Sequence, residues 1–280
     1  LQRALVQSPI EPSSPTGFFF HETRCGSTLV ANMLASRPDN VMWSESTGPW
    51  KLMHTCPKCP KAQVVRFLRV IMHSMTRSPA HQHFYFKFQS SEDIDLVTAA
   101  FPGVPWVFLF REPIEVLMSR LGAQRIGMEG MEEEVAAKVE KGMKAGPTKR
   151  GGGRPKREVE MARQLSILCK KAITAYENHP GMGMMVEYPH LPQAVLDTVL
   201  PDHFGVNVSK EEYEAMMKTT NMYSKVANYK KGEVGGEFHT DVEAKQDAAN
   251  QLVHDMADKY LYPVYGQLLG LQTWLEVEVQ

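Results

Sequence analysis

Short runs of bulky apolar residues recur along the chain, separated by polar and turn-forming residues. They cover Gly17–His21, Phe84–Phe88, Trp106–Phe110 and Gly183–Val186. Continuous apolar runs of this length are typical of strands that are buried on both faces of a sheet. We therefore predict a strand at each of these four places.

Between these runs the apolar positions change to a helical spacing. Residues 29–34 show this spacing directly after the first run, and Pro113 stands near the start of a second periodic stretch, where it suits the first turn of a helix. We expect longer helices from about Val159 to Tyr176 and from about Asp241 onward. Strands that alternate with helices predict an α/β fold of the P-loop type, with three α/β/α layers and a central, mostly parallel sheet that binds ligands at the carboxyl ends of its strands.

The chain divides into a short lead-in and one large domain. Residues 1–16 are rich in proline and serine, so we expect an extended segment that packs on the domain without joining its sheet. Residues 17–280 form the single domain. Residues 144–157 contain six cations and no large apolar side chain, which predicts a flexible basic loop. A flap over an anionic substrate is the alternative interpretation of that loop.

Charge and hydropathy exclude several classes of partner. The formal net charge of −1 gives no overall attraction to nucleic acid or to an anionic membrane, so an anion site must be a local cluster. No apolar run is long enough for a membrane span, and the N-terminus lacks the pattern of a signal peptide. The chain starts at Leu1, which leaves an upstream anchor open. The cytoplasm is slightly favoured, with the Golgi lumen as the alternative.

The four cysteines are too few for a disulfide scaffold in a chain of this length. Cys56 and Cys59 lie close to His54 in the sequence. Together these three residues would supply three of the ligands of a zinc site. We expect free thiols in a loop there, with a metal site or a disulfide as the alternatives.

The clearest chemistry lies in the loop after the first predicted strand, His21-Glu-Thr-Arg-Cys-Gly-Ser-Thr28. A loop between a buried strand and a helix presents backbone N–H groups and the positive end of the helix dipole to an oxyanion. Gly26 would allow a phosphate to approach the backbone closely. The sequence is not a Walker A motif, because no lysine follows the glycine, and this disfavours a kinase or NTPase.

This loop resembles the phosphosulfate loop of sulfotransferases that use 3′-phosphoadenosine-5′-phosphosulfate (PAPS). Arg24-Cys25-Gly26-Ser27-Thr28 matches the family pattern position by position. The resemblance implies that these residues bind the 5′-phosphosulfate of the cofactor.

Two further stretches are similar to motifs of the same family, in the same order along the chain. Arg111 ends a predicted strand, is followed by an acidic residue and a proline, and has Ser119 on the next helix. Lys230, Lys231 and Gly232 look like the basic loop near the C-terminus of these enzymes. The resemblance implies that all five residues bind the 3′-phosphate of PAPS.

The resemblance looks closest to the branch that contains tyrosylprotein and carbohydrate sulfotransferases, because Arg24 stands where the small-molecule enzymes usually have lysine. It implies that Glu45 is the general base and that Lys87 steadies the transferring sulfonate. Gln89 stands where the small-molecule enzymes have a catalytic histidine, and this departure also favours Glu45. His54 and His83 are reserve candidates for the base.

The implied function is transfer of the sulfonate from PAPS to a hydroxyl or amine acceptor, with release of 3′,5′-ADP and without a required metal. The acceptor is a small molecule, a carbohydrate or a peptide, and residues 47–83 and 131–157 are where we expect its recognition. A small-molecule kinase and an inactive nucleotide-binding domain of the same fold are the alternatives.

Overall fold

The computed structural model describes residues 10–55, 58–89, 91–122, 157–220 and 242–272, together with residue 274. In this part of the chain, five strands form one sheet in the order β2-β3-β1-β4-β5, and every neighbouring pair is parallel. The strands are β1 (Gly17–His21), β2 (Asn40–Ser44), β3 (His83–Phe88), β4 (Trp106–Phe110) and β5 (Gly183–Glu187).

The four predicted strands are confirmed, and β2 is an addition that the apolar pattern did not reveal. Every residue of β1 and β4 is buried, which explains why their sequences are apolar without alternation. β2 lies at the edge of the sheet, and Asn40 is its only buried residue. An edge strand that is half solvated needs no continuous apolar run, so its sequence carries a weak signal.

One face of the sheet is covered by three helical segments: α2 (Ser27–Ala35), η3 (Val195–His203) and α8 (Lys210–Thr220). Phe19 of β1 and Tyr85 of β3 point to this face and pack against Met33 and Leu34 of α2. Phe204, directly after η3, contacts the rings of both Phe19 and Tyr85. These contacts hold α2, and with it the end of the preceding loop, firmly against the sheet.

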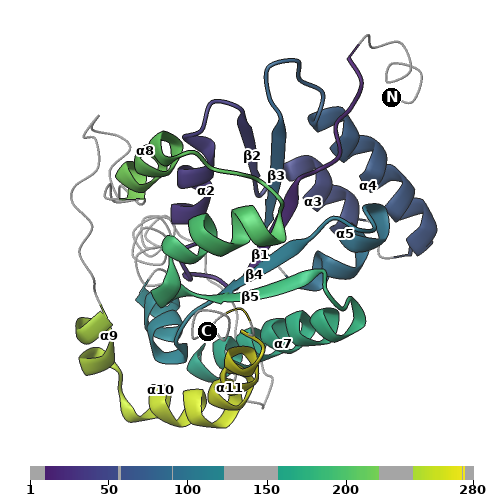
Figure 1. The fold of residues 1–280 in the computed structure, drawn as a ribbon. Coiled ribbons are helices and arrows are strands. Elements are labelled where there is room, and N and C mark those ends of the chain that lie inside the picture. Colours follow the sequence, from purple (N-terminus) through teal and green to yellow (C-terminus); the bar gives the residue numbers. More distant parts are fainter. Residues whose placement is uncertain are drawn as a thin grey trace, which may run out of the picture.

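The other face carries most of the aromatic side chains of the strands. It is covered by α3 (Thr47–His54), α4 (Lys61–Met75), α5 (Ile94–Ala100), α7 (Arg157–Asn178) and α11 (Tyr262–Gly270) (Figure 1). The 3-10 turn η1 (Ser91–Asp93) leads into α5. The fold is therefore the predicted three-layer α/β/α arrangement with a parallel central sheet.

The helix expected from about Asp241 onward is interrupted at residues 249 and 250, so the expectation of one helix is wrong. α9 (Val242–Ala248) ends before the interruption, and α10 (Gln251–Met256), η5 (Ala257–Leu261) and α11 follow one another without a gap after it. Asn250 starts α10 afresh, because its side chain accepts a hydrogen bond from the backbone N–H of Val253. The break lets α10 and η5 pack on α7 and on the helical residues 113–122.

The order of the strands creates a topological switch point between the carboxyl ends of β1 and β3. The chain leaves β1 by way of α2 on one face of the sheet and leaves β3 by way of α5 on the other. Loops that diverge in this way mark the switch point where open α/β sheets bind ligands.

Candidate functional site

The loop between β1 and α2, residues 22–26, begins at this switch point and ends at an uncapped helix. Gly26 is the N-cap of α2, no side chain caps the helix, and its first turn contains no acidic residue. The first backbone N–H groups of a helix have no acceptor within the helix, and the helix dipole adds positive potential there. The start of α2 is thus suited to bind an anion.

Gly26 is required at its position for two separate reasons. Its backbone is left-handed, with φ of +83°. A Cβ atom added to it would lie 2.7 Å from the ring of Tyr188, which belongs to the short turn η2 (Tyr188–His190) after β5. Packing of the loop against Tyr188 therefore leaves no room for a larger residue.

Arg24 joins the first predicted motif to the second. Its Nε atom donates a hydrogen bond of 2.6 Å to Oγ of Ser119, which lies on the helix that follows β4. The two residues are 95 positions apart in the sequence. The structure thus brings together a guanidinium, a hydroxyl and a helix N-terminus, which are donors of the kind that bind phosphate.

Arg111, at the end of β4, lies in the same region but is already paired. Its guanidinium forms a buried ion pair with Glu115, one helical turn further on, and stacks 3.9 Å from the ring centre of Tyr188. Tyr188 therefore contacts both Gly26 and Arg111. The sequence analysis did not identify Glu115 or Tyr188, although an acidic residue four positions after an arginine at a helix start is a recognisable signal.

Glu45 and Lys87 form an ion pair at the carboxyl ends of β2 and β3. Ser44, the last residue of β2, is the register partner of Lys87, so Glu45 lies just beyond it. Nζ of Lys87 is 2.9 Å from Oε1 of Glu45, and the Glu45 N–H donates to the carbonyl of Lys87. The lysine is almost fully buried, whereas the Glu45 side chain is 40% exposed and can meet a ligand from solvent.

His21 completes this cluster from β1. Its Nε2 atom is 3.4 Å from the same oxygen of Glu45. The neighbouring imidazole of His21 is the largest effect that lowers the pKa of Glu45 to about 2, and Lys87 acts in the same direction against partial burial. The sequence analysis did not identify His21, although a polar residue at the end of a buried strand, directly before a glycine loop, was an available signal.

Among the described residues, Arg24 and Glu45 are the non-glycine residues with positive φ, at +67° and +51°. A left-handed backbone at a non-glycine residue stores strain of about 1–3 kcal/mol and persists where the surroundings impose it. Such residues are concentrated at functional sites. Both were predicted site residues on independent grounds.

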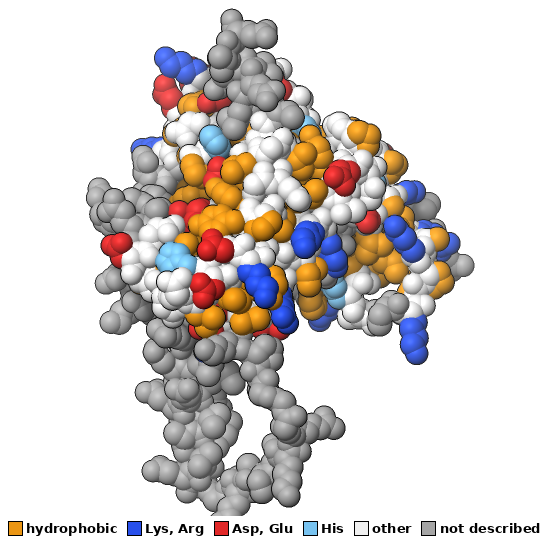
Figure 2. Space-filling view, turned by 90° about the horizontal axis from the view of Figure 1, so that it is seen from below, with side chains coloured by type: hydrophobic (Ala, Val, Ile, Leu, Met, Phe, Trp, Pro, Cys, Tyr) orange, Lys and Arg blue, Asp and Glu red, His pale blue; other side chains and the backbone are white. Residues whose placement is uncertain are grey.

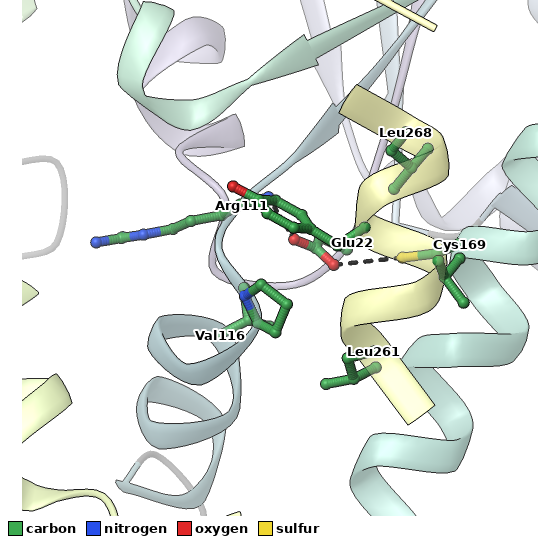
Figure 3. A pocket seen from close by; sticks show the side chains of 9 residues that line it. Glu22, Arg111, Val116, Cys169, Leu261 and Leu268 are labelled. Atoms are coloured by element: carbon green, nitrogen blue, oxygen red, sulfur yellow. Dashed lines mark hydrogen bonds between the residues drawn. The ribbon is translucent and has the colours of Figure 1, made fainter. Parts of the chain in front are cut away.

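Glu22 is the first residue of the loop between β1 and α2, and its carboxyl group is buried. Its Oε1 atom accepts the backbone N–H of Arg111 at 2.5 Å, and the thiol of Cys169 donates to its Oε2 at 3.5 Å. Figure 3 shows this carboxyl turned toward Cys169, with the Arg111 side chain extending away from both. Burial raises the pKa of Glu22 to about 8, so the group is mainly protonated at neutral pH.

The reserve histidines lie apart from this cluster. Nε2 of His54 is 3.1 Å from the buried carboxyl group of Asp93, next to the exposed ring of Trp50. His83 is the first residue of β3, so it lies at the amino end of the strand, whereas Lys87 lies near the carboxyl end. Gln89 is exposed at the end of that strand. Lys230, Lys231, Gly232 and most of the basic segment 144–157 lie outside the described residues.

The expectation of free thiols is wrong for Cys59, which takes part in a disulfide bond. A thiol that is oxidised in this way is not available as a zinc ligand. Cys25 and Cys169 are free and buried. The described part of the chain contains no group of three or more residues suited to bind a metal ion.

No helix of the described residues is long and apolar enough to cross a membrane. Figure 2 shows the face seen from below, where acidic, basic and hydrophobic side chains are interspersed among the described residues. No single kind of charged side chain dominates this face.

The sequence matches no protein-family model and no curated protein significantly. The structure, however, resembles solved sulfotransferase domains. The sulfotransferase domain of the Synechococcus PCC 7002 olefin synthase has a TM-score of 0.55 at 13% identity, covering 91% of this chain and 98% of that one.

The sulfotransferase domain of the curacin biosynthetic pathway has a TM-score of 0.53 at 13% identity, covering 89% and 98% of the two chains. The sulfotransferase STF9 of Mycobacterium avium has a TM-score of 0.50 at 10% identity, covering 92% and 79%. At these identities the similarity concerns the fold. The chain therefore has a sulfotransferase-like α/β fold.

Proposed function

We propose that this protein is a PAPS-dependent sulfotransferase. The observation that carries the proposal is the hydrogen bond between Arg24 and Ser119, which joins two separate phosphate motifs at the carboxyl edge of the sheet. Because an arginine, a hydroxyl and an open helix N-terminus converge there, the site suits a ligand with more than one phosphate. The sulfotransferase-like fold agrees with this function.

In this proposal the β1–α2 loop holds the 5′ end of the cofactor. Arg24 and the backbone of residues 25–28 bind the phosphosulfate, while Arg111 and Ser119 bind the 3′-phosphate. Lys230, Lys231 and Gly232 close over the same phosphate, as the family resemblance implies. Bound PAPS supplies an activated sulfonate on a phosphate leaving group, so a dedicated metal ion is not required.

Lys87 and Glu45 act on the acceptor side of the proposed site. Lys87 stabilises negative charge on the sulfonate, and Glu45 removes the proton of the acceptor hydroxyl. With its pKa lowered to about 2, the Glu45 of the ion pair is a weak base. An anionic sulfonate competes for the ammonium of Lys87, which weakens the pair and raises the proton affinity of Glu45 when it is needed.

We propose a small molecule, a carbohydrate or a peptide as the acceptor, and the branch that the sequence resembles makes carbohydrate hydroxyls and peptide tyrosines the first classes to screen. α3 begins directly after Glu45 and presents the exposed ring of Trp50, which makes residues 47–83 the region to examine for acceptor contacts. Screening these acceptor classes with labelled PAPS tests the assignment.

Cofactor binding should stabilise the folded protein. At about 100 times its dissociation constant, 3′,5′-ADP should add about 2.7 kcal/mol to the free energy of unfolding, measured as a thermal shift. ATP with magnesium serves as the comparison, because a kinase would respond to it instead. A well-folded protein that responds to neither 3′,5′-ADP nor PAPS would contradict the proposed function.

The role of Arg111 can be tested by comparing two nucleotides. Arg111→Ala should weaken 3′,5′-ADP binding by about 1.5–3 kcal/mol and leave 5′-AMP binding nearly unchanged, because the lost charge-assisted bond is to the 3′-phosphate. Arg120→Ala removes a neighbouring arginine that bonds to Gln164 and provides the control for calorimetry. Equal losses for both nucleotides would show that the Arg111–Glu115 pair has only a structural role.

A further inference from the structure

We infer that His21 is a positioning residue that keeps Glu45 ionised and oriented toward the acceptor. The inference rests on the proposed role of Glu45 as the base and adds a third residue to the Glu45–Lys87 pair. It is carried by the two contacts of the imidazole, by the register of the sheet and by the burial of the ring.

The sheet register places His21 and Lys87 on one face. Phe19 of β1 is the register partner of Lys87 of β3, and side chains two residues apart along a strand share a face. His21 follows Phe19 by two residues, so it lies beside Lys87 and one step nearer the carboxyl edge. On its other side, His21 pairs with Leu109 of β4, which is apolar and brings no charge to the ring.

The contacts of the imidazole fix the proton on one of its nitrogens. Nδ1 lies 2.6 Å from the carbonyl oxygen of Glu22, and a carbonyl oxygen can only accept a hydrogen bond. Nδ1 therefore carries a hydrogen. Nε2 is buried, forms no hydrogen bond among the described residues, and has Oε1 of Glu45 as its neighbour at 3.4 Å. An ion pair between Nε2 and Glu45 thus requires the imidazolium form of His21, whose charge favours an ionised Glu45.

Both cationic neighbours of Glu45 contact the same oxygen. Lys87 and His21 are each closest to Oε1, so Oε2 is the oxygen turned away from them. Since the side chain is 40% exposed, Oε2 is the oxygen that an acceptor hydroxyl can approach. If Lys87 moves to the sulfonate, His21 is the contact that still holds the carboxylate in this orientation.

The charged groups around the ring come from three elements. Glu45 follows β2 and Lys87 belongs to β3, while Glu22 adjoins His21 in the chain and turns its carboxyl toward Arg111 and Cys169. Glu45 is thus the one carboxylate that contacts the ring among the described residues. The coupling is expected to be between these two groups.

The test measures the ionisation of Glu45 directly by carbon NMR of protein labelled in its glutamate carboxyl groups, with Glu45→Gln identifying the resonance. In the wild-type protein Glu45 should stay ionised throughout the acidic range in which the protein remains folded. In His21→Phe the pKa of Glu45 should rise by about one to two units, because a charged hydrogen-bond donor has been lost. As the pH is lowered, the rate of sulfonate transfer should then begin to fall at a correspondingly higher pH than in the wild-type protein, because Glu45 must be unprotonated to act.

His21→Gln keeps a neutral N–H donor and should give a smaller rise in the same direction. If His21→Phe fails to fold, His21→Gln alone shows whether His21 lowers the pKa of Glu45. His190→Phe, which removes a histidine after β5, is the control and should leave Glu45 unchanged. The inference is overturned if neither folded His21 variant raises the pKa of Glu45 by more than about 0.3 units.

This test is independent of the proposed function. The carboxyl resonance reports the His21–Glu45 coupling without cofactor or turnover, whereas 3′,5′-ADP binding by the same proteins reports the cofactor site. Failure of the wild-type protein to bind 3′,5′-ADP would contradict the proposed function, and the coupling would still be measured. If the wild-type protein binds 3′,5′-ADP and both His21 variants do not, His21 supports the β1–α2 loop instead. That result would overturn its role in orienting the base.

Discussion

Glu45→Gln should lower turnover by about 10²–10⁴-fold while PAPS affinity stays within about a factor of three. Glutamine keeps the shape of the side chain but cannot take a proton from the acceptor. The substitution also removes the negative partner of Lys87 and of His21, and neither of these residues belongs to the loop of residues 22–26. The loss should therefore concern the acceptor step. Turnover at saturating PAPS and acceptor, together with PAPS binding by calorimetry, provides the measurement.

Glu212→Gln is a suitable control, because Glu212 lies on α8 and pairs with Arg37 away from this cluster. More than about a tenth of wild-type turnover in Glu45→Gln, under conditions where chemistry limits the rate, would transfer the role of the base to His54. His83 is a weaker candidate for the base because it lies at the amino end of β3, away from the carboxyl end where Lys87 lies. A loss of PAPS affinity as well would place Glu45 in the support of the cofactor site.

The second large effect is expected at Glu22 and concerns the stability of the protein as a function of pH. Burial raises the pKa of this carboxyl from 4.5 to about 8 in the folded state. Between these two values the folded protein binds a proton that the unfolded chain has lost. The contribution of Glu22 to stability is thus fully present below about pH 4.5 and is lost as the pH rises toward 8.

Glu22→Gln removes this dependence, because glutamine resembles the protonated acid and does not titrate. Its oxygen can still accept the backbone N–H of Arg111. Relative to the variant, the wild-type protein should lose about 2–4 kcal/mol of stability between about pH 5 and pH 8, an order-of-magnitude figure from about 1.4 kcal/mol per pKa unit. Urea unfolding of both proteins across this range measures the difference.

Glu177→Gln, at an exposed position of α7, is the matched control, and its stability should change with pH in parallel with the wild-type protein. A constant difference between wild type and Glu22→Gln across the same range would mean that Glu22 is ionised in the folded protein, and it would contradict the effect of burial. A result of that kind would mean that the backbone hydrogen bond and the charge of Arg111 outweigh the burial of Glu22.

Local sequence patterns were sufficient to predict the strands that are buried in the sheet. The strands β1, β3, β4 and β5 were predicted because buried parallel strands require apolar side chains at every position. The edge strand β2 was not predicted, because solvent covers part of it and relaxes that requirement. The C-terminal helix was predicted in one piece, since helical spacing persists across the break that Asn250 introduces.

For the candidate site, sequence motifs identified single residues but not their partners. Arg24, Glu45, Lys87, Arg111 and Ser119 were identified because their motifs resemble those of a known family. The ion pair between Arg111 and Glu115 was missed, and it changes what Arg111 offers to a ligand.

By itself, the sequence determined which segments are buried strands, where the glycine loop opens onto a helix, and which charged residues follow the strands. These features depend on neighbours along the chain, where the apolar pattern and the backbone freedom of glycine act directly. Only the tertiary structure decided that His21 and Lys87 meet at Glu45 and that Glu22 holds a proton beneath the loop. The first depends on the register of strands that are distant in sequence. The second depends on burial of Glu22 among residues that are distant in sequence, such as Arg111 and Cys169. Neither is encoded in local spacing.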